Sequence, residues 1–431
     1  MNGKEILARL PHLSEVETIK DVPQLTHALF PGTHCPLMGA AMAVGGIKDA
    51  LMVIVGTDEC SYYTKTLAMG LENFGGPKGR CCSVVLSQHD VTFGSTEKMH
   101  NAFKEIVEEY KPSCVFLVTT CVIEVIGDDY DSIADELSRK YEIPVLAVHT
   151  EHFKCEDHFP GLERTVTACF DLMEKTEQGK SVNVLGQRMG NFATTELYKV
   201  LKDAGVEIGM QLPSGTTLAE IKKAAQAKVN IVVHELALPL AKKMNESFGT
   251  PYVYFNKFVN PDKIMQAYTD LFKFLELPLP KEITGKFMAA KGMEKEIAPS
   301  LKGITYIYGN SPFACFEYNA YMAKLGMIPQ VIQSNHLPEE AGEDIANILK
   351  FVDPYIVKAA NIAPLQYVYD ECKPYVYVGH EFADRLRKKG IAVLHADPAG
   401  RMQGFEAVMF ILGNLQKTIE MAKEYKKEAT K

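Results

Sequence analysis

Residues 114–130 read CVFLVTTCVIEVIGDDY, and this stretch decides the predicted fold. The apolar run over residues 114–118 is typical of a parallel strand that is buried on both faces. A Thr-Thr-Cys segment ends the run, and a Gly-Asp-Asp turn and an amphipathic helix follow. We therefore expect the Cys121 thiol at the carboxyl end of a strand, where open α/β sheets bind ligands.

Two further cysteines stand beside turns at element ends, Cys35 in HCPLMGAAMAVGGIKDA and Cys60 in IVGTDECSYY. Thiols placed in this way suggest a metal cluster rather than disulfides, because soft thiolates select iron–sulfur clusters, zinc or Cu(I). The sequence contains no CxxC pair, so a zinc ribbon or knuckle is not expected. From the residues alone, buried structural cysteines remain the alternative.

The other cysteines are weaker candidates for ligands. Cys81 and Cys82 are adjacent, and neighbouring side chains in an extended segment point to opposite faces. We therefore do not expect the two to bind the same cluster, although one of them could replace one of the three cysteine ligands. The remaining thiols read as core or surface cysteines: Cys114, Cys155, Cys169, Cys315 and Cys372.

Length and composition narrow the class of protein. A chain of 431 residues exceeds what one core supports, so two or three domains are expected. The net charge of −8 argues against nucleic-acid binding, and no apolar run is long enough to span a membrane. The start, MNGKEILARLPHLSEVETIK, lacks the apolar core of a signal peptide, and ten cysteines fit a reducing compartment. We therefore expect a cytoplasmic protein.

Strand-like apolar runs alternate with helical periods along the chain, which is the pattern of doubly wound parallel-sheet α/β domains. Three blocks stand out, and we predict three Rossmann-like domains at residues 1–178, 179–299 and 300–431. A polar linker is expected over residues 174–180, and a helical bridge is expected over residues 261–300. In the first block the predicted strands are residues 50–55, 83–86, 114–118 and 145–148.

The segments CPLMGA, GTDEC, FGS and YKPSCVFLVTTCVIEVIGDDYDSIADEL together resemble the N-terminal domain of the nitrogenase component 1 superfamily. The resemblance implies three Rossmann-like domains around a shallow central cleft. It also implies that Cys35, Cys60 and Cys121 bind an iron–sulfur cluster, either 4Fe–4S or a larger P-cluster-like one, at the interface of two related subunits. Three thiolates leave a four-iron cluster one short, so a partner chain or a residue such as Asp58 must complete it.

The same resemblance implies two protein partners. One is a homologous α-type subunit in an α2β2 heterotetramer, and the other is a separate ATP-dependent homodimeric iron–sulfur reductase. The segment GQRMGN after the predicted strand at residues 182–185 is not a dinucleotide fingerprint, and no P-loop occurs. Gly186 and Gly190 read as turn glycines, and we do not expect this chain to hydrolyse ATP.

The motif QHDVTFGS at residues 88–95 resembles a family segment that lies before a surface helix. By that resemblance, Phe93 lies close to the docked reductase. A purely structural interpretation is compatible with this, because Gly94 and Ser95 would end a strand and cap a helix over residues 96–110, with Ser95 accepting a backbone N–H.

Glu235 and His395 bear on a possible large cofactor. In the catalytic α subunit of nitrogenase, a Cys after a strand and a His in the third domain anchor the iron–molybdenum cofactor. The segment VNIVVHELALPLAKKM resembles the first site but carries Glu235 in place of the Cys, and VLHADPAGRMQGFEAV resembles the second with His395 in place. A hard carboxylate is a poor ligand for an iron–sulfide cofactor. The departure favours a β-type, electron-relay subunit, with any complex cofactor in the partner, and leaves His395 as a hydrogen-bonded cleft histidine.

The resemblance therefore predicts an oxidoreductase subunit of a nitrogenase-like two-component reductase in an anaerobic or microaerobic cytoplasm. It would relay low-potential electrons from the ATP-dependent reductase to a substrate-reducing site. Candidate reactions are C–S bond reduction, as in methylthio-alkane reductases, or N₂ reduction. The alternatives are a non-catalytic scaffold on which a complex iron–sulfur cofactor matures, and a homodimeric tetrapyrrole reductase of the coenzyme F430 type.

Overall fold

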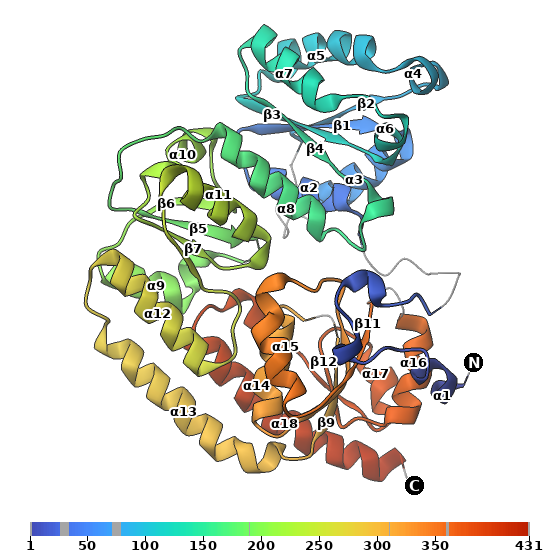
Figure 1. Cartoon of the computed structure of the whole chain (residues 1–431), viewed down its shortest axis with the longest axis vertical. Helices are drawn as coiled ribbons and strands as arrows, with labels where there is room; N and C mark the ends of the chain where they lie inside the picture. Colours follow the sequence, from blue (N-terminus) through green and yellow to red (C-terminus); the bar gives the residue numbers. More distant parts are fainter. Residues whose placement is uncertain are drawn as a thin grey trace.

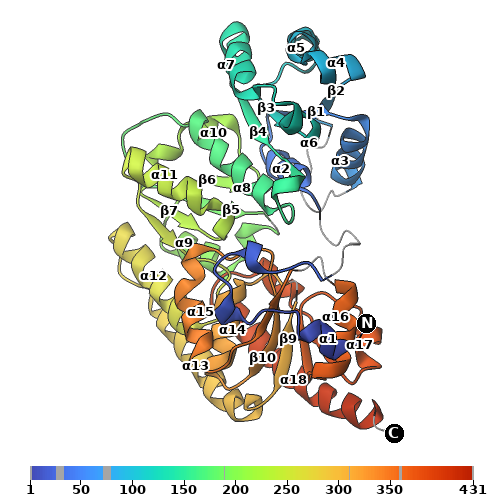
Figure 2. The ribbon, with the colours of Figure 1, turned by 45° about the vertical axis from the view of Figure 1, so that its right-hand side comes forward.

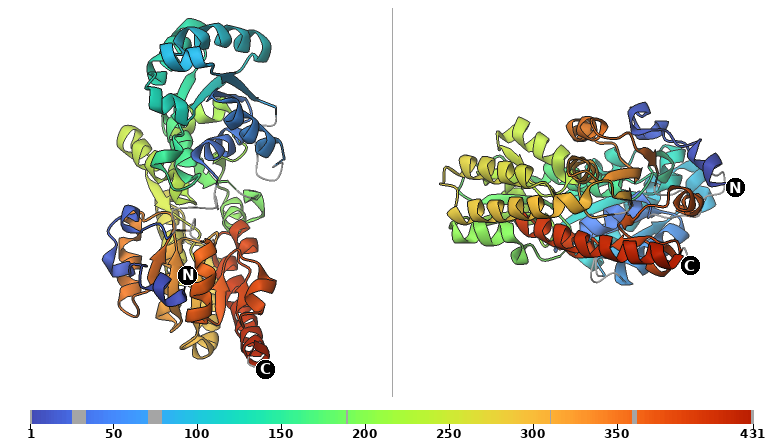
Figure 3. Two further views of the ribbon diagram at one scale, coloured as in Figure 1. Left: turned by 90° about the vertical axis from the view of Figure 1, so that its right-hand side faces the viewer. Right: turned by 90° about the horizontal axis from the view of Figure 1, so that it is seen from below.

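The computed structural model describes residues 2–25, 34–70, 79–188, 190–309, 311–358 and 362–429. Three parallel β-sheets follow one another along the long axis of the molecule, with helices packed on them (Figures 1 and 3). The predicted fold class, α/β with three doubly wound parallel sheets, is confirmed.

The first sheet contains four parallel strands in the order β2-β1-β3-β4. Their side chains alternate between two apolar layers, as a strand that is buried on both faces requires. Helices α5 and α7 cover one face, and α2 and α8 cover the other (Figure 1). The bounds are β1 (Ala50–Gly56), β2 (Cys81–Val85), β3 (Cys114–Thr119), β4 (Val145–His149), α2 (Pro36–Gly45), α5 (Thr96–Tyr110), α7 (Tyr130–Tyr141) and α8 (Phe159–Ala168).

The second sheet has the order β6-β5-β7-β8 and shares an apolar core with the first. Backbone contacts also join the two, since the Gly215 N–H donates to the Gly46 carbonyl at 2.8 Å and the Leu218 N–H to the Asp49 carboxylate at 2.9 Å. The bounds are β5 (Val182–Gln187), β6 (Ile208–Pro213), β7 (Val229–Val232) and β8 (Tyr252–Tyr254), with α9 (Glu196–Asp203), α10 (Leu218–Lys222) and α11 (Leu238–Phe248) around them.

The third sheet has five parallel strands in the order β11-β10-β9-β12-β13. Three helices, α12, α13 and α18, run along its side and contribute to the core that it shares with the second sheet (Figure 1). The predicted helical bridge over residues 261–300 is thus confirmed as α12 (Pro261–Leu275) and α13 (Lys281–Leu301). The other bounds are β9 (Thr305–Tyr308), β10 (Ile328–Gln333), β11 (Tyr355–Val357), β12 (Val376–Val378), β13 (Ala392–Leu394), α14 (Cys315–Lys324), α15 (Gly342–Leu349), α16 (Ile362–Cys372), α17 (Ala383–Arg387) and α18 (Phe405–Ala429).

The N-terminal segment, residues 2–25, packs against the third sheet rather than the first (Figure 2). Helix α1 (Gly3–Leu7) lies on α16, and the Leu13 N–H donates to the Pro354 carbonyl at 2.9 Å. We predicted residues 1–178 as one N-terminal domain, so this segment departs from that prediction. Its apolar side chains pack into the core of the third sheet, although the first sheet is nearer in the sequence. The other domain boundaries stay predictions.

The first and third domains meet through polar side chains. The Asp157 carboxylate accepts hydrogen bonds from His336 Nε2 at 2.9 Å and from Asn335 Nδ2 at 3.0 Å. Burial alone would raise the pKa of Asp157, but the hydrogen bond and charge of His336, together with the hydrogen bonds from Asn335 and Phe159, lower the pKa to about 2. Burial alone would lower the pKa of His336, but the hydrogen bond to Asp157 and the charges of Asp157, Glu235 and Glu163 together raise it above its ordinary 6.5.

The Asp157→Asn variant should be less stable by about 2 kcal/mol near pH 5.5, because a hydrogen bond to a charged group is lost. The stabilising effect of Asp157 is present above its ordinary pKa of 3.8 and is lost as the pH falls through about 2. The effect of His336 is present below 6.5 and is lost as the pH rises through its folded pKa. The difference in stability between wild type and variant, followed by thermal melting from pH 4 to 9, should therefore shrink on the alkaline side.

Asp131→Asn is the matched control, because Asp131 also faces a histidine, His149, at 3.2 Å but is 75% exposed. We expect its effect to stay within about 0.5 kcal/mol. Equal effects of the two substitutions at every pH would contradict the role assigned to Asp157.

Candidate functional site

The carboxyl ends of β1 and β3 touch each other at the middle of the first sheet. A Cβ atom added to Gly56 would lie 1.8 Å from Thr120 Oγ1, so only glycine fits there. The Thr120 N–H also donates to the Val55 carbonyl at 3.1 Å. The strand order reverses between β1 and β3, which is where open α/β sheets form a binding crevice. The helices that follow these strands, α3 (Asp58–Gly70) and α6 (Cys121–Ile126), therefore begin side by side.

The three predicted cysteines all lie at helix N-termini. Cys35 is the N-cap of α2, Cys60 lies in the first turn of α3, and Cys121 is the first residue of α6. All three are free and partly exposed. The free N–H groups and the dipole at a helix N-terminus favour negative charge nearby.

The structure also brings these thiols together. Burial raises the pKa of the Cys35 thiol, the backbone N–H groups of Met38 and Leu37 oppose this rise, and the neighbouring thiols of Cys60 and Cys121 add to it. Within the described part of the chain, no three His, Cys, Asp or Glu side chains lie close enough to hold one metal ion. A multi-iron cluster places iron and sulfide between its thiolates, so its ligands need not converge on one point. The donor set fits such a cluster better than a single ion.

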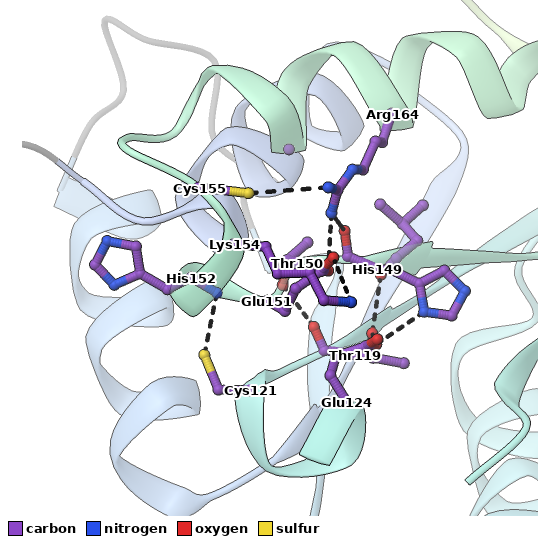
Figure 4. Close-up of polar contacts among 12 residues, drawn as sticks. Thr119, Cys121, Glu124, His149, Thr150, Glu151, His152, Lys154, Cys155 and Arg164 are labelled. Carbon is purple, nitrogen blue, oxygen red and sulfur yellow. Dashed lines mark hydrogen bonds and ion pairs between the residues drawn. The ribbon is translucent and has the colours of Figure 1, made fainter. Parts of the chain in front are cut away.

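The Cys121 sulfur accepts a hydrogen bond from the backbone N–H of His152 at 3.2 Å (Figure 4). His152 begins the short helix η4 (His152–Lys154), which follows β4. Arg164 of α8 holds this loop, because one of its nitrogens lies 2.7 Å from the His149 carbonyl and 2.8 Å from the Glu151 carboxylate (Figure 4). The ion pair between Arg164 of α8 and Glu151 of the loop therefore fixes the position of the His152 N–H.

A second polar group fastens α6 to the sheet. Glu124, one turn after Cys121, accepts hydrogen bonds from the Thr119 hydroxyl and from His149 Nδ1, the latter at 2.8 Å (Figure 4). Burial lowers the pKa of His149, but the hydrogen bonds to Glu124 and Asp131 outweigh it and raise the pKa. Glu124 thus fastens the middle of α6 to the ends of β3 and β4.

The adjacent cysteines Cys81 and Cys82 begin β2, at the opposite end of the sheet from the carboxyl strand ends. They pack in the two different apolar layers, as their alternation predicts. Burial raises their pKa values to about 11 and about 12, which disfavours the thiolate that binds metal. This placement gives neither of them access to the site of Cys121.

Large apolar side chains are exposed on the elements that carry the thiols. They are Tyr62 on α3, Val125 on α6 and Phe153 on η4. Phe93, the predicted docking residue, ends the adjacent α4 (Gln88–Phe93) and is 75% exposed, with its ring 4.8 Å from that of His89. Exposed apolar groups on neighbouring elements are typical of protein interfaces.

The Ser95 side chain does not cap helix α5 as we expected. Its side chain accepts no backbone N–H at the helix start, and its hydroxyl instead hydrogen-bonds to Asp128 and Tyr130. The Ser95 backbone has a ψ of 1° rather than an extended value, so the hydroxyl points toward the Gly-Asp-Asp turn.

A second candidate site is a cavity of about 200 Å³ where the three domains meet. Glu235 lines it together with His234, shortly after β7. Burial raises the pKa of Glu235. His395 lies elsewhere: it follows β13, is exposed and does not line this cavity. The two residues that the resemblance paired are therefore not brought together around the cavity.

Comparison with known proteins gives the family. A family model described as nitrogenase component 1 type oxidoreductase matches residues 35–418. This chain belongs to the nitrogenase component 1 type oxidoreductase family. The predicted recognition of the family is confirmed. In fold, a solved structure of nitrogenase Cp1 at pH 6.5 matches 93% of this chain and 94% of that chain, with a TM-score of 0.77 at 14% identity.

Two curated relatives of this component 1 chain come from Clostridium pasteurianum. The iron-molybdenum cofactor biosynthesis protein NifE is 31% identical over 223 residues, which cover 51% of this chain and 49% of NifE. The nitrogenase molybdenum-iron protein alpha chain is 24% identical over 370 residues, which cover 81% of this chain and 68% of it. The match to NifE thus spans about half of that protein. These relatives are NifE and an alpha chain, so they add no support to the β-type assignment, which stays a prediction.

Sequence reasoning missed several residues of this component 1 chain. Arg164 and Glu151 position the N–H that contacts Cys121, and Arg188 lines the central cavity. No sequence pattern predicts the ion pair of Arg164 with Glu151, because only the fold brings these two residues together. A sequence pattern could have indicated Arg188, because this residue directly follows an apolar strand. Among the described residues, no helix has the length and apolar character that crossing a bilayer requires.

Replacing Gly56 by Ala should destabilise the first domain by about 1–3 kcal/mol, because the new methyl group would overlap the Thr120 side chain. Gly285→Ala is the control, since Gly285 lies in helix α13 with no atom within 4 Å of an added Cβ. We expect that control to be neutral or stabilising, by up to about 1 kcal/mol. Urea unfolding of both variants would measure this, and an equally small effect of the two would show that the strand ends do not touch.

Proposed function

We propose that this chain is an iron–sulfur subunit of a nitrogenase-like two-component reductase. The observation that carries the proposal is the placement of Cys35, Cys60 and Cys121, three partly exposed thiols at helix N-termini within electrostatic reach of one another. When bound, a 4Fe–4S or larger cluster would supply one-electron transfer at low potential. The three thiolates would hold it, and the His152 N–H would stabilise negative charge on the Cys121 sulfur.

The proposed site is incomplete in one chain. Four-iron clusters usually have four thiolate ligands, and these three cysteines leave one ligand to be supplied by a partner or by Asp58, which is exposed two residues before Cys60. The exposed Tyr62, Val125 and Phe153 would be covered by the same partner, and their burial would exclude water from the cluster. We propose a homologous α-type partner subunit in an α2β2 assembly.

Phe93 is the proposed contact of the ATP-dependent homodimeric iron–sulfur reductase. Its exposure and the packing of α4 against α6 support this role, because a partner bound at Phe93 would lie within a short path of Cys121. The electrons would go on to a substrate-reducing site, proposed to lie in the partner subunit, with C–S bond or N₂ reduction as the candidate reactions. The proposed setting is an anaerobic cytoplasm.

A scaffold for cofactor maturation is the second candidate function. The similarity to NifE favours it, since that protein is named for iron-molybdenum cofactor biosynthesis. Turnover assays with the reductase and ATP would separate the two. Sustained product formation supports the reductase, whereas transfer of a bound metal cofactor to an acceptor protein without turnover supports the scaffold.

Cys→Ala substitution at position 35, 60 or 121 should remove most of the bound iron and the visible charge-transfer absorption, because each would delete one thiolate ligand. Cys372→Ala is the matched control, since this partly exposed thiol lies at the end of α16 in the third domain. Iron and sulfide analysis of the anaerobically purified complex measures the outcome. Full iron content in all three variants would refute the ligand assignment.

Arg164→Gln should lower the midpoint potential of the bound cluster while keeping its iron. The reason is that the freed loop would no longer hold the His152 N–H at the Cys121 sulfur, and hydrogen bonds to cluster sulfur stabilise the reduced state. An EPR-monitored redox titration measures the shift. Arg139→Gln, which removes an exposed arginine from α7, is the control. An identical midpoint potential in both variants would show that Arg164 does not influence the cluster.

A further inference from the structure

Arg188 occupies the switch point of the second sheet. The order β6-β5-β7-β8 reverses between β5 and β7, so the segments that follow these two strands flank a crevice. Arg188 directly follows β5, and His234 and Glu235 follow β7. All three residues line the central cavity. None of Cys35, Cys60 and Cys121 lines this cavity.

A bulge at Gly186 directs Arg188 toward the cavity. Gly186 has a φ of +95°, and the pairing of β5 with β6 shifts its register between Leu185 and Gln187. A Cβ atom at position 186 would lie 2.9 Å from the His234 backbone nitrogen, so a side chain has no room. We predicted a turn glycine here, and it is instead a strand glycine at a close backbone approach. Bulges of this kind re-aim the side chains that follow them.

The guanidinium of Arg188 has no carboxylate partner at ion-pair distance among the residues that the structure describes. Its hydrogen-bond contact is Nη1 to His158 Nε2, at 3.3 Å. Burial and the nearby Arg188 charge lower the pKa of His158 to about 4, so this imidazole is neutral at pH 7 and does not balance the charge. Burial lowers the pKa of Arg188, and the nearby charges of Asp157 and Glu235 oppose this fall without contacting the guanidinium. Arginine stays protonated in proteins, so a buried positive charge faces the cavity with no directly bound carboxylate.

Among the described residues, the carboxyl groups around the cavity form no ion pair with Arg188. Asp157 is bound by His336 and Asn335, and Glu340 is bound by Lys242 at 2.6 Å. Burial raises the pKa of Glu317 to about 8, so this group is largely protonated at pH 7.

Two further carboxyl groups lie near the cavity without binding Arg188. Asp344 pairs with Lys263 at 2.6 Å, and burial raises the pKa of Glu235. Arg188 therefore faces the cavity without a carboxylate in direct contact.

His234 adds a hydrogen-bond donor next to Arg188. Burial is the main cause that holds the pKa of His234 below its ordinary value, and the positive charges of Arg188 and Lys257 lower it further, so the ring is neutral. Its Nδ1 accepts the Leu236 backbone N–H at 3.3 Å, which leaves the proton on Nε2. A guanidinium and an imidazole N–H on one wall of a cavity suit a carboxylate or phosphate oxygen.

We propose that the central cavity binds a small organic oxyanion through Arg188 and His234. The ligand is a carboxylate or phosphate ester small enough for about 200 Å³. Where the family resemblance places a metal-binding Cys, this chain has Glu235, so the cavity is equipped for an organic anion instead of a metal–sulfur group. The inference does not depend on cluster binding by the thiols.

The test measures binding of succinate, inorganic phosphate and neutral succinamide to the purified full-length chain by calorimetry at pH 7. Succinate or phosphate should bind the wild type, and succinamide should bind at least tenfold more weakly because it lacks the charge. Arg188→Gln should weaken anion binding at least tenfold. The anion affinity of Arg188→Lys should lie between those of the wild type and Arg188→Gln, since lysine keeps the charge but cannot form the paired hydrogen bonds of a guanidinium. The better of the two anions identifies the ligand as a carboxylate or a phosphate.

Arg385→Gln is the control, because Arg385 lies on α17 over the exposed Phe382 ring and does not line the cavity. Thermal melting of the variants checks folding. Because burial disfavours the Arg188 charge and no carboxylate contacts it, Arg188→Gln should have an unchanged or higher melting temperature. The substitution should also abolish the rise in melting temperature that the anion gives the wild type. The proposal is overturned if neither anion binds the wild type, if succinamide binds equally, or if Arg188→Gln binds like the wild type.

Discussion

The reversal of strand order at the middle of each parallel sheet is the constraint on which this structure depends. In all three sheets the chain winds outward in both directions from two central strands, β1 and β3, β5 and β7, and β9 and β12. Parallel strands end at one edge, and the loops after the two central strands diverge to opposite faces, which leaves a crevice between them. Side chains placed directly after these strands are brought together, although they are far apart in sequence.

The first two sheets use this arrangement for different chemistry. At the first, Gly56 allows Thr120 to approach, and the helices that follow carry Cys60 and Cys121 in their first turns. At the second, Gly186 allows His234 to approach, and the crevice carries a guanidinium and an imidazole. The same backbone device thus presents soft thiols on a partly exposed edge and, inside a cavity, hydrogen-bond donors of which one is cationic. Apolar cores join the second sheet to the first and to the third, whereas the first and third domains meet through hydrogen-bonded polar groups such as Asp157 and His336.

Much of the fold follows from the sequence, because buried parallel strands are continuous apolar runs. The predicted strands at residues 50–55, 114–118 and 145–148 lie within β1, β3 and β4. Short strands such as β8 and β11, of three residues each, carry too little pattern to be predicted. The placement of residues 2–25 on the third sheet was also hidden, since an amphipathic segment does not specify which core it joins.

The candidate site was predictable in part. Strand-end position and residue type single out Cys121, and the family resemblance adds Cys35 and Cys60. The Glu151–Arg164 pair and the contact of Arg188 with His158 depend on side chains that only the folded chain brings together. His395 shows that a motif match can also mislead, because this residue matches a family motif but does not line the central cavity.

The central claim is that Cys35, Cys60 and Cys121 together hold one iron–sulfur cluster. Its most direct test is an anomalous difference map at the iron absorption edge, from crystals of the anaerobically purified complex. The account predicts one iron cluster in contact with all three sulfur atoms, with its remaining ligand from a partner chain or from Asp58. Iron bound elsewhere, or contact with fewer than three of these sulfurs, would contradict it.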